Sequence, residues 1–345
     1  MAKMVYTLFE APCRSAEMPQ VVTLGDINVD VIAHIPRYPP SGGDGLAWRA
    51  SVHGGGSAAN TAAVLARLGV DVGLIGRVGE DPLAEWALAE LAEAGVDLSA
   101  VQRDLEVMTG LMFIAVTPDG ERTMFGYRGA NARTSPDLLD EAYIAAARLL
   151  HLSGYALLEG PQRDAALRAL EVARGAGLTV TLDVGLEAAA RLAPEIQGLL
   201  PQVDLLLPTL AEAKRLTGRG DAEEAVEQLL RWGAKAVALK MGAQGCLVGT
   251  GEGIFAVPAF AVEVRDTTGA GDAFDAGLIW GRLRRLGWRE SALLASALGA
   301  LAAAVEGAGG SLPGREEVRA FLEEREDDPF WRAWRRELRR LLDLL

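Results

Sequence analysis

Short runs of apolar and β-branched residues alternate with longer helical patterns over most of this 345-residue chain. This alternation is typical of βαβ units, in which successive strands lie parallel and helices cover the sheet. The sequence therefore predicts an α/β fold with a mostly parallel central sheet. The expected strands are 21–24, 72–75, 149–152, 178–182, 205–207 and 236–240, and the expected helices are 57–68, 83–94, 163–174, 211–216, 222–232 and 273–283.

Two stretches depart from the alternation. The strand-like runs 111–116 and 122–127 flank Thr117-Pro-Asp-Gly120, a sequence that favours a tight turn, so they predict a β-hairpin. Together with the strand-like run 46–52, this hairpin is expected to form a small separate sheet that covers a site. A second hairpin, turning around 249–253, is expected to form an antiparallel edge of the main sheet.

Charge and composition exclude several classes of protein. The 34 Lys and Arg residues are outnumbered by 47 Asp and Glu residues, and the formal net charge of -13 disfavours nucleic acid or an anionic membrane as a partner. Two cysteines, Cys13 and Cys246, are too few for a disulfide framework, and the three histidines have no metal-ligand spacing. With no long apolar run and no signal-peptide pattern, we expect a cytoplasmic protein that binds neither nucleic acid nor membrane.

The segment Asp266-Thr-Thr-Gly-Ala-Gly-Asp272 joins a strand-like run, 261–264, to a predicted helix. Small residues at a helix N-terminus leave backbone N–H groups open, and the helix dipole attracts anionic oxygen there. We therefore expect a phosphoryl site at Gly269, Ala270 and Gly271. A carboxylate beside such a site repels phosphate, so its presence there indicates a catalytic role. Asp272 could take a proton from an attacking hydroxyl. The alternative is a purely structural cap made by Thr268 or Asp272.

Two further polar segments lie near the start of the chain. In His53-Gly-Gly-Gly-Ser-Ala-Ala-Asn60 the glycines formally match a dinucleotide fingerprint, but the first strand lies too early for that context. The glycines instead favour close approach of a polyhydroxylated ligand that Asn60 would bind. Asn28 and Asp30, after the first strand, would point to one side of an extended segment and suit sugar hydroxyls. No Walker loop occurs, which excludes a P-loop NTPase.

In these motifs the chain resembles the ribokinase-like family, also called the PfkB carbohydrate kinases, over roughly residues 21–313. Gly55-Gly-Ser-Ala-Ala-Asn60 and Asp266-Thr-Thr-Gly-Ala-Gly-Asp272 make the resemblance specific. It implies a three-layer sandwich with a small β-sheet lid. The implied organisation is one kinase domain, 20–345, with lid strands from about 44–53 and 108–128, an N-terminal extension, 1–19, and a C-terminal helical extension, 315–345, packed on the domain.

The resemblance also implies a role for individual residues. Asp272 matches the catalytic base, and Gly269, Ala270 and Gly271 match the anion hole. The implied substrate-binding residues are Asn28, Asp30, Gly55, Gly56, Asn60, Arg128 and Asn131, and the implied nucleotide-binding residues are Thr209, Lys240, Gly242, Gly245 and Thr268. Glu212 matches an acid that meets Mg²⁺ through water. Asp266 and Ser311 match positions that hold a monovalent cation, K⁺, in many members.

Three departures from the family pattern concern specificity and metal binding. Thr209 stands where the Asn of an N-x-x-E motif is usual, which puts metal affinity in doubt. After Asp183 the usual Asn and nearby Arg are absent, so a contact to phosphate or to an acidic substrate is missing. Ser153-Gly154 replaces the glutamate that grips the sugar in ribokinases, which argues against ribose.

The expected activity is ATP-dependent, Mg²⁺-requiring phosphorylation of a hydroxyl, expected to be primary, on a small sugar or sugar derivative. One alternative acceptor is a 2-keto-3-deoxygluconate-type sugar acid held by Arg128. Another is a nucleoside whose base would stack on Trp48 with Phe113 or Phe125. A non-catalytic sugar or nucleotide sensor is the third alternative, which the intact Asp272 disfavours. The resemblance further implies a homodimer formed through the lid.

Overall fold

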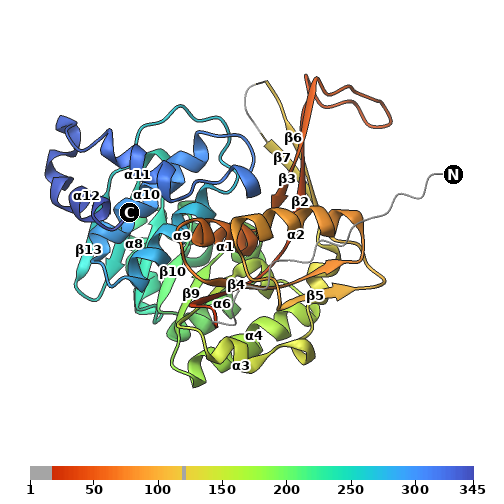
Figure 1. The fold of residues 1–345 in the computed structure, drawn as a ribbon, viewed down its shortest axis with the longest axis horizontal. Helices are drawn as coiled ribbons and strands as arrows, with labels where there is room; N and C mark the ends of the chain where they lie inside the picture. Colours follow the sequence, from red (N-terminus) through yellow and green to blue (C-terminus); the bar gives the residue numbers. More distant parts are fainter. Residues whose placement is uncertain (1–17, 119–121) are drawn as a thin grey trace.

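The computed structural model describes residues 18–118 and 122–345 and builds them into two sheets flanked by helices (Figure 1). Cys13, most of the expected N-terminal extension and the turn residues Asp119 and Gly120 lie outside the described residues.

The larger sheet has nine strands in the order β13-β12-β11-β10-β9-β8-β1-β4-β5. The neighbours from β5 to β11 pair in parallel, whereas β11, β12 and β13 pair antiparallel. The predicted fold class and the antiparallel edge are thus confirmed. The strands are β1 (Val21–Leu24), β4 (Val72–Gly79), β5 (Val101–Asp104), β8 (Leu149–Ser153), β9 (Thr179–Asp183), β10 (Leu205–Leu207), β11 (Ala236–Lys240), β12 (Cys246–Thr250) and β13 (Gly253–Val257).

The strand order reverses at β1, because the chain first builds β4 and β5 on one side of β1 and then β8 to β11 on the other. Such a reversal separates the loops at the carboxyl ends of the two central strands, and open α/β sheets bind their ligands there. Gly25 sits at this point, where a Cβ would lie 2.8 Å from the Cβ atoms of Ala58 and Ser153.

Helices cover both faces of the nine-stranded sheet (Figure 1). One apolar core contains side chains of α1 (Ser57–Arg67), α2 (Pro82–Ala94), α9 (Ala270–Leu283) and α10 (Trp288–Ala303). The other contains side chains of α3 (Glu141–Ala145), α4 (Gly160–Gly175), α5 (Leu186–Arg191), α6 (Ala193–Leu199), α7 (Leu210–Thr217) and α8 (Ala222–Arg231). Helix α10 was not predicted, because it is buried nearly all round and so lacks the polar face that marks an amphipathic helix.

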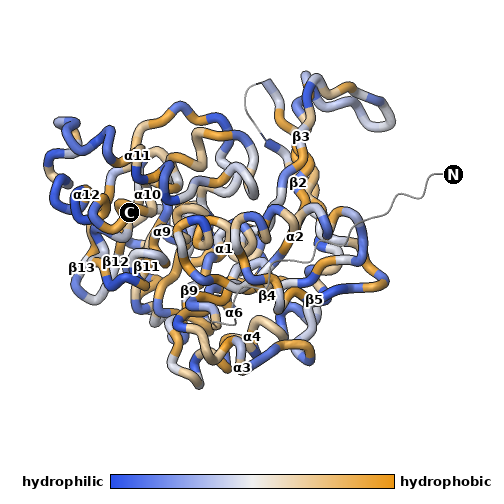
Figure 2. The backbone as a smooth tube through the Cα atoms, viewed as in Figure 1, coloured by the Kyte–Doolittle hydropathy of each residue, from blue (hydrophilic) through white to orange (hydrophobic). Residues whose placement is uncertain are grey.

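The smaller sheet has the order β3-β2-β6-β7 and projects from the body of the molecule (Figure 1). We call these four strands the lid: β2 (Asn28–His34), β3 (Arg49–Gly55), β6 (Gly110–Val116) and β7 (Arg122–Tyr127). The sequence predicted three of them, although β3 begins later and extends further than 46–52. The structure adds β2 as an inner strand. Hydrophobic residues are concentrated where β2 runs along the lid (Figure 2).

The strand register divides the lid into two faces. Asp30 pairs with His53 and Met112, and Val116 pairs with Arg122, so all of these side chains belong to one face together with the buried Ile32 and Ile114. We call this the inner face. The outer face carries exposed apolar side chains, namely Val52, Phe113, Phe125 and Tyr127.

The last 31 residues, 315–345, pack on the same core as α9 and α10. They contain α11 (Arg315–Glu323) and α12 (Arg335–Leu342). Between these helices, Trp331 is buried and stacks on Phe260 with ring centroids 4.0 Å apart. The guanidinium of Arg289 on α10 lies 3.9 Å from the ring centroid of Trp334.

The expected strand at 261–264 is wrong, because this segment forms no strand. It follows β13, the last strand of the sheet, and leads away toward α9. Val264 is 62% exposed, so the β-branched residue that suggested a strand here is neither paired in a sheet nor buried.

Candidate active site

Polar side chains gather where the parallel strands end. Asp26 follows β1, Ser153 ends β8, Asp183 ends β9, Thr209 follows β10 and Lys240 ends β11. Since the carboxyl ends of parallel strands meet at one edge of the sheet, these residues share that edge. Helix α1 begins at the same edge. Gly56, just before the helix, has φ +100° and lies so close to Asp26 that an added Cβ would overlap the Asp26 carbonyl oxygen.

Asn60 on α1 and Asp272 on α9 join the two glycine motifs. The side-chain amide of Asn60 donates to Oδ2 of Asp272 at 2.7 Å, and Thr61 Oγ1 donates to the Asp272 backbone carbonyl at 3.4 Å. Burial raises the pKa of Asp272 to about 6, and the negative charge of Asp183 adds to this rise. The hydrogen bond from Asn60 acts in the opposite direction. Asp272 is therefore largely ionised at neutral pH and can accept a proton.

Helix α9 begins at Ala270 after Gly269, whose φ of +75° suits glycine. No side chain caps this end of the helix. Thr268 instead turns its hydroxyl to Asp266 Oδ1, donating at 2.7 Å, so the cap expected as a structural alternative does not form. The first N–H groups of α9 thus meet no side-chain acceptor, as an anion site requires.

Asp30 lies on the inner face of the lid directly over Gly55. A Cβ at position 55 would overlap the Asp30 carboxylate, which explains why a glycine stands there. Asp30 is 6% exposed, and burial raises its pKa to about 7, with the charges of Asp272 and Asp266 adding to the effect. The lid and α9 therefore bring two carboxylates with raised pKa values toward one site.

Asn131 is buried behind Asn28. Its Nδ2 donates to Asn28 Oδ1 at 2.8 Å and to the Ile27 carbonyl at 3.1 Å, while its Oδ1 accepts from Ile27 N at 2.8 Å. The structure thus gives the amide of Asn131 partners within the protein, and through them Asn131 fixes the orientation of Asn28. The expectation that Asn131 binds substrate directly has no geometric basis here.

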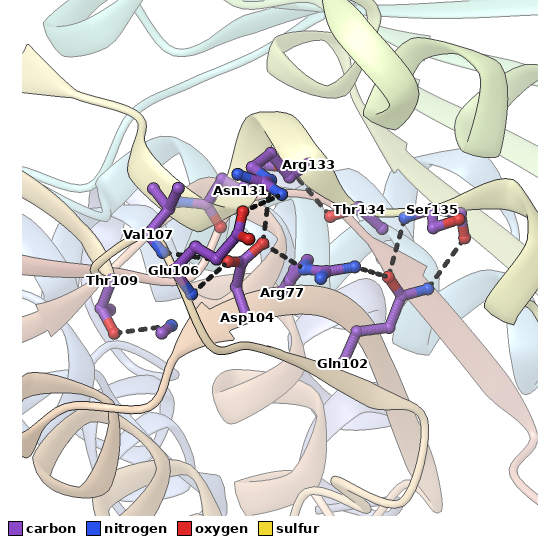
Figure 3. Close-up of polar contacts among 11 residues, drawn as sticks. Arg77, Gln102, Asp104, Glu106, Val107, Thr109, Asn131, Arg133, Thr134 and Ser135 are labelled. Atoms are coloured by element: carbon purple, nitrogen blue, oxygen red, sulfur yellow. Dashed lines mark hydrogen bonds and ion pairs between the residues drawn. The ribbon is translucent and has the colours of Figure 1, made fainter.

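A polar network at the base of the lid holds the segment that carries Asn131 (Figure 3). Asp104 is buried and accepts from the backbone N–H groups of Glu106 and Val107 at 3.0 and 2.9 Å. Arg77 and Arg133 each approach Oδ2 of Asp104 to 3.0 Å. These four contacts outweigh the effect of burial and hold the pKa of Asp104 below its usual range.

Arg128 follows β7 and turns toward the end of β1. Its NH2 donates to Asp26 Oδ1 at 2.9 Å, and it also contacts Gln162. Its NH1 lies 3.6 Å from Glu159. The positive charge of Arg128 is therefore already balanced by carboxylates within the protein.

Lys240 was expected to face the nucleotide, but its side chain is 10% exposed and points into the protein. Its Nζ donates to Asp183 Oδ1 at 2.9 Å and to Asp275 Oδ1 at 3.0 Å. Burial acts to raise the pKa of Asp183, but the Lys240 ammonium holds it below its usual range. A Cβ on Gly271 would lie 3.6 Å from Nζ, so this ammonium sits behind the first turn of α9.

The other nucleotide-side residues lie beyond β10 and β11. Gly242 begins a short exposed turn that ends at Gly245. Thr209 and Glu212 form a capping box at the start of α7, in which Thr209 N donates to Glu212 Oε2 at 2.8 Å and Glu212 N donates to Thr209 Oγ1 at 3.3 Å. Thr209 therefore serves as the N-cap of α7. Burial raises the pKa of Glu212.

Asp266 and Ser311 lie in two neighbouring loops. Asp266 Oδ2 accepts from Gly307 N at 3.0 Å, which ties the segment before α9 to the loop that contains Ser311. Ser311 ends a short turn, Gly309–Ser311. Gly309 N donates to Asn60 Oδ1 at 3.4 Å, so this loop also contacts the centre of the site.

The sequence did not predict a role in this region for four residues: Glu90, Arg122, Asp183 and Asp275. Asp183 was noted only as the end of a strand. Glu90 Oε2 accepts from the N–H groups of Gly54 and Gly310, both at 3.1 Å, and so links the front motif to the last loop. Nothing in the sequence of α2 distinguishes Glu90 from a surface acid. Asp275 did offer a signal, because it is a second carboxylate, one turn after Asp272, in a helix whose other side chains are mostly apolar.

The described residues, 18–118 and 122–345, contain no group of three or more His, Cys, Asp or Glu side chains that could hold a metal ion. They also contain no helix of the length and hydropathy needed to span a bilayer.

Comparison with protein families matches residues 18–315 to the pfkB family carbohydrate kinases. The chain is 36% identical over 310 residues to an ATP-dependent ribose-1-phosphate kinase of Halopiger xanaduensis, covering 90% of this chain and 100% of that protein. It is 32% identical over 278 residues to a 2-dehydro-3-deoxygluconokinase of Bacillus subtilis, covering 77% of this chain and 86% of that protein.

Solved structures show the same architecture. The adenosine kinase of Sinorhizobium meliloti matches with a TM-score of 0.79 and 26% identity, over 89% of this chain and 100% of that chain. The Arabidopsis thaliana ribokinase complexed with ribose and ATP matches with a TM-score of 0.75 and 26% identity, over 88% of this chain and 99% of that chain.

Proposed function

This chain belongs to the pfkB family of carbohydrate kinases, and we propose that it transfers the γ-phosphoryl group of ATP to a hydroxyl, expected to be primary, of a small sugar or sugar derivative. The observation that carries this proposal is the half-buried Asp272, which lies in the first turn of an uncapped helix and is oriented by Asn60. A carboxylate next to open N–H groups places a proton acceptor beside a phosphoryl site.

In this mechanism Asp272 takes the proton of the acceptor hydroxyl. The acceptor oxygen forms a bond to the γ-phosphorus while the bond from that phosphorus to the bridging oxygen of ADP breaks. The N–H groups at the start of α9 stabilise the charge on the transferring group, and Lys240 behind Gly271 offsets the negative charge of Asp183 and Asp275. Asp30 on the lid would accept hydrogen bonds from sugar hydroxyls and so orient the acceptor.

Magnesium would enter with the nucleotide. Mg²⁺ keeps several waters and binds through substrate phosphates with one or two carboxylates. Glu212 is the carboxylate that would hold it through water, since one of its oxygens is fixed by Thr209 N. When bound, the ion would neutralise charge on the β- and γ-phosphate oxygens.

A sugar 1-phosphate is the first acceptor to test. The relative from Halopiger is a ribose-1-phosphate kinase and matches over its whole length. Free ribose is disfavoured, because Ser153 has no carboxylate and Gly154 cannot be replaced by glutamate: a Cβ at position 154 would overlap the Val184 carbonyl. Arg128, which follows lid strand β7, is the cation that we propose would meet the 1-phosphate, although Asp26 already balances its charge.

The structure favours the other acceptors less. A sugar acid would rely on Arg128 as well, and the relative from Bacillus subtilis keeps this acceptor in the panel. The nucleoside hypothesis placed the base on Trp48 with Phe113 or Phe125. Both phenylalanine rings lie on the outer face of the lid, opposite Asp30, so neither can form that slot together with the site.

We also propose that two copies associate through the outer face of the lid. Phe113, Phe125 and Tyr127 are 41%, 59% and 49% exposed on that face, and a two-fold interface would bury the same residues from both copies. Sedimentation equilibrium of wild type and of Phe125→Asp tests this. A wild-type dimer that the substitution converts to monomer is expected, and a wild-type monomer at micromolar concentration would contradict it.

The function itself is tested by ADP release with Mg²⁺ and ATP across ribose 1-phosphate, ribose, fructose, 2-keto-3-deoxygluconate and adenosine. We expect one acceptor-dependent rate that Asp272→Asn abolishes while the protein stays folded. If the folded protein binds ATP but no acceptor raises the rate, a sensor replaces the kinase as the better hypothesis. Full activity of Asp272→Asn would refute the base assignment.

A further inference from the structure

The carboxylate expected to ligate a monovalent cation is already occupied by an arginine of the lid. Arg122, the first residue of β7, extends from the inner face of the lid. Its NH1 donates to Asp266 Oδ1 at 2.9 Å and to Thr268 Oγ1 at 2.7 Å, and its NH2 contacts Thr267 Oγ1. One guanidinium thus binds three consecutive residues just before the glycine turn that begins α9.

The surroundings of Asp266 leave a cation poorly accommodated. Oδ1 also accepts from Thr268 N at 2.9 Å and from Thr268 Oγ1 at 2.7 Å, and Oδ2 accepts from Gly307 N at 3.0 Å. A K⁺ ion bound here would share its carboxylate with a guanidinium, and the two positive charges would repel each other. The residues present therefore do not fit the expected cation while Arg122 is in place.

A second contact holds the lid on the adjoining loop. Glu306 lies 2.7 Å from Arg49 NH1 on β3 and 3.3 Å from His34 Nε2 on β2. Glu306 directly precedes Gly307, whose N–H donates to Asp266. Three lid strands therefore contact the two loops that surround Asp266.

We propose that Arg122 is a positioning residue that takes the place of the monovalent cation and orders the segment 266–271 only when the lid is closed. This rests on the proposed function, because that segment supplies the phosphoryl site. The charge that balances Asp266 then arrives with the lid instead of from solution. The site would be completed when the closed lid also excludes water, which limits hydrolysis of ATP in the absence of an acceptor.

The test compares wild type, Arg122→Ala and Arg122→Lys in KCl and in tetramethylammonium chloride at equal ionic strength. Thr123→Ala is the matched control, since Thr123 neighbours Arg122 on β7 but belongs to the outer face. The first readout is hydrogen exchange of the amides of 266–271 without substrate, which needs no known acceptor. The second is kcat and KM with whichever acceptor is found.

We expect segment 266–271 of wild type to exchange at the same rate in both salts. In Arg122→Ala it should exchange faster in tetramethylammonium and recover protection in KCl, whereas Thr123→Ala should behave as wild type. The alanine variant should lose about tenfold or more in kcat with a smaller change in the acceptor KM, and both KCl and the lysine variant should restore part of the loss.

The exchange data separate this inference from the proposed function. If no acceptor is phosphorylated but exchange follows the expected pattern, the kinase assignment fails and the role of Arg122 stands. If wild-type exchange or kcat depends strongly on K⁺, or if Arg122→Ala leaves exchange of 266–271 unchanged in both salts, the role of Arg122 is refuted.

Discussion

The side-chain amide of Asn60 donates a 2.7 Å hydrogen bond to the carboxylate of Asp272, from 212 positions earlier in the chain. This bond favours the ionised carboxylate, whereas burial favours the protonated one, and burial dominates. The proton affinity of the proposed base is therefore set by two helices that meet at the edge of the sheet.

Asn60→Ala should move the acid limb of kcat/KM to higher pH. Asp272 can accept a proton only above its pKa of about 6, and loss of the Asn60 hydrogen bond raises that pKa further. Thr61→Val is the matched control, because Thr61 donates to the Asp272 backbone carbonyl and not to its carboxylate. If Asn60→Ala does not shift the acid limb of kcat/KM, a group other than Asp272 limits activity in acid.

Asp272→Asn should abolish turnover and yet stabilise the fold at pH 7. The folded-state pKa of about 6 lies above the usual 3.8, so the folded state binds this proton more tightly and stability falls as pH rises through that window. We expect the free energy of unfolding to increase by about 1 to 3 kcal/mol. Denaturant titrations at pH 7 and below pH 4 measure the gain and its disappearance in acid. A less stable variant at pH 7 would contradict this linkage.

Lys240→Met should destabilise the protein by about 3 to 5 kcal/mol, because it leaves the carboxylates of Asp183 and Asp275 buried without their cation. Adding Asp275→Asn should recover part of the loss. The control is Lys235→Met, which removes an ion pair with Asp204 from a lysine that is 58% exposed and should cost at most about 1 kcal/mol. Equal losses for the two lysines in urea unfolding would argue against a buried charge cluster.

Gly55→Ala should raise KM for the acceptor about tenfold or more and leave KM for ATP nearly unchanged. The added methyl group would displace the Asp30 carboxylate that is proposed to orient the sugar. Gly198→Ala, in α6, is the control, since a Cβ there meets no atom within 4 Å. Equal effects on both substrates would place Gly55 in the general packing of the site.

Asp104→Asn should reduce stability at neutral pH by about 2 to 4 kcal/mol, since Arg77 and Arg133 would lose their buried partner. The folded-state pKa of Asp104 lies below its usual range, so its contribution is present above pH 4 and is lost as pH falls through the folded-state pKa. Thermal unfolding at pH 7 and pH 3 should therefore show a difference in Tm between variant and wild type that is smaller at pH 3. An equal difference at both pH values would show that the charge of Asp104 does not contribute to stability.

Local properties of the chain were sufficient for the fold class and for the two glycine motifs. Apolar runs that alternate with helical patterns indicate buried strands, and glycines before a helix indicate an N-terminus with free N–H groups. Both patterns are local and do not depend on tertiary contacts. Eight strands of the larger sheet, its antiparallel edge included, accordingly follow the predictions, whereas β5 was not predicted and α9 begins at Ala270 instead of the expected 273. The chemistry proposed for Asp272 could be read from its place in that motif.

Contacts between distant segments were decided only by the tertiary structure. Lys240 sits in a glycine-rich nucleotide-side motif, yet two carboxylates from β9 and α9 draw its ammonium inward, because an unbalanced buried charge is costly. The sequence around Arg122 indicates only a β-hairpin. The register of β6 and β7 places its side chain on the inner face of the lid, where it pairs with Asp266. The sequence determines which residues can carry charge or accept a proton. Which charges meet depends on strand order and register, and no local pattern records these.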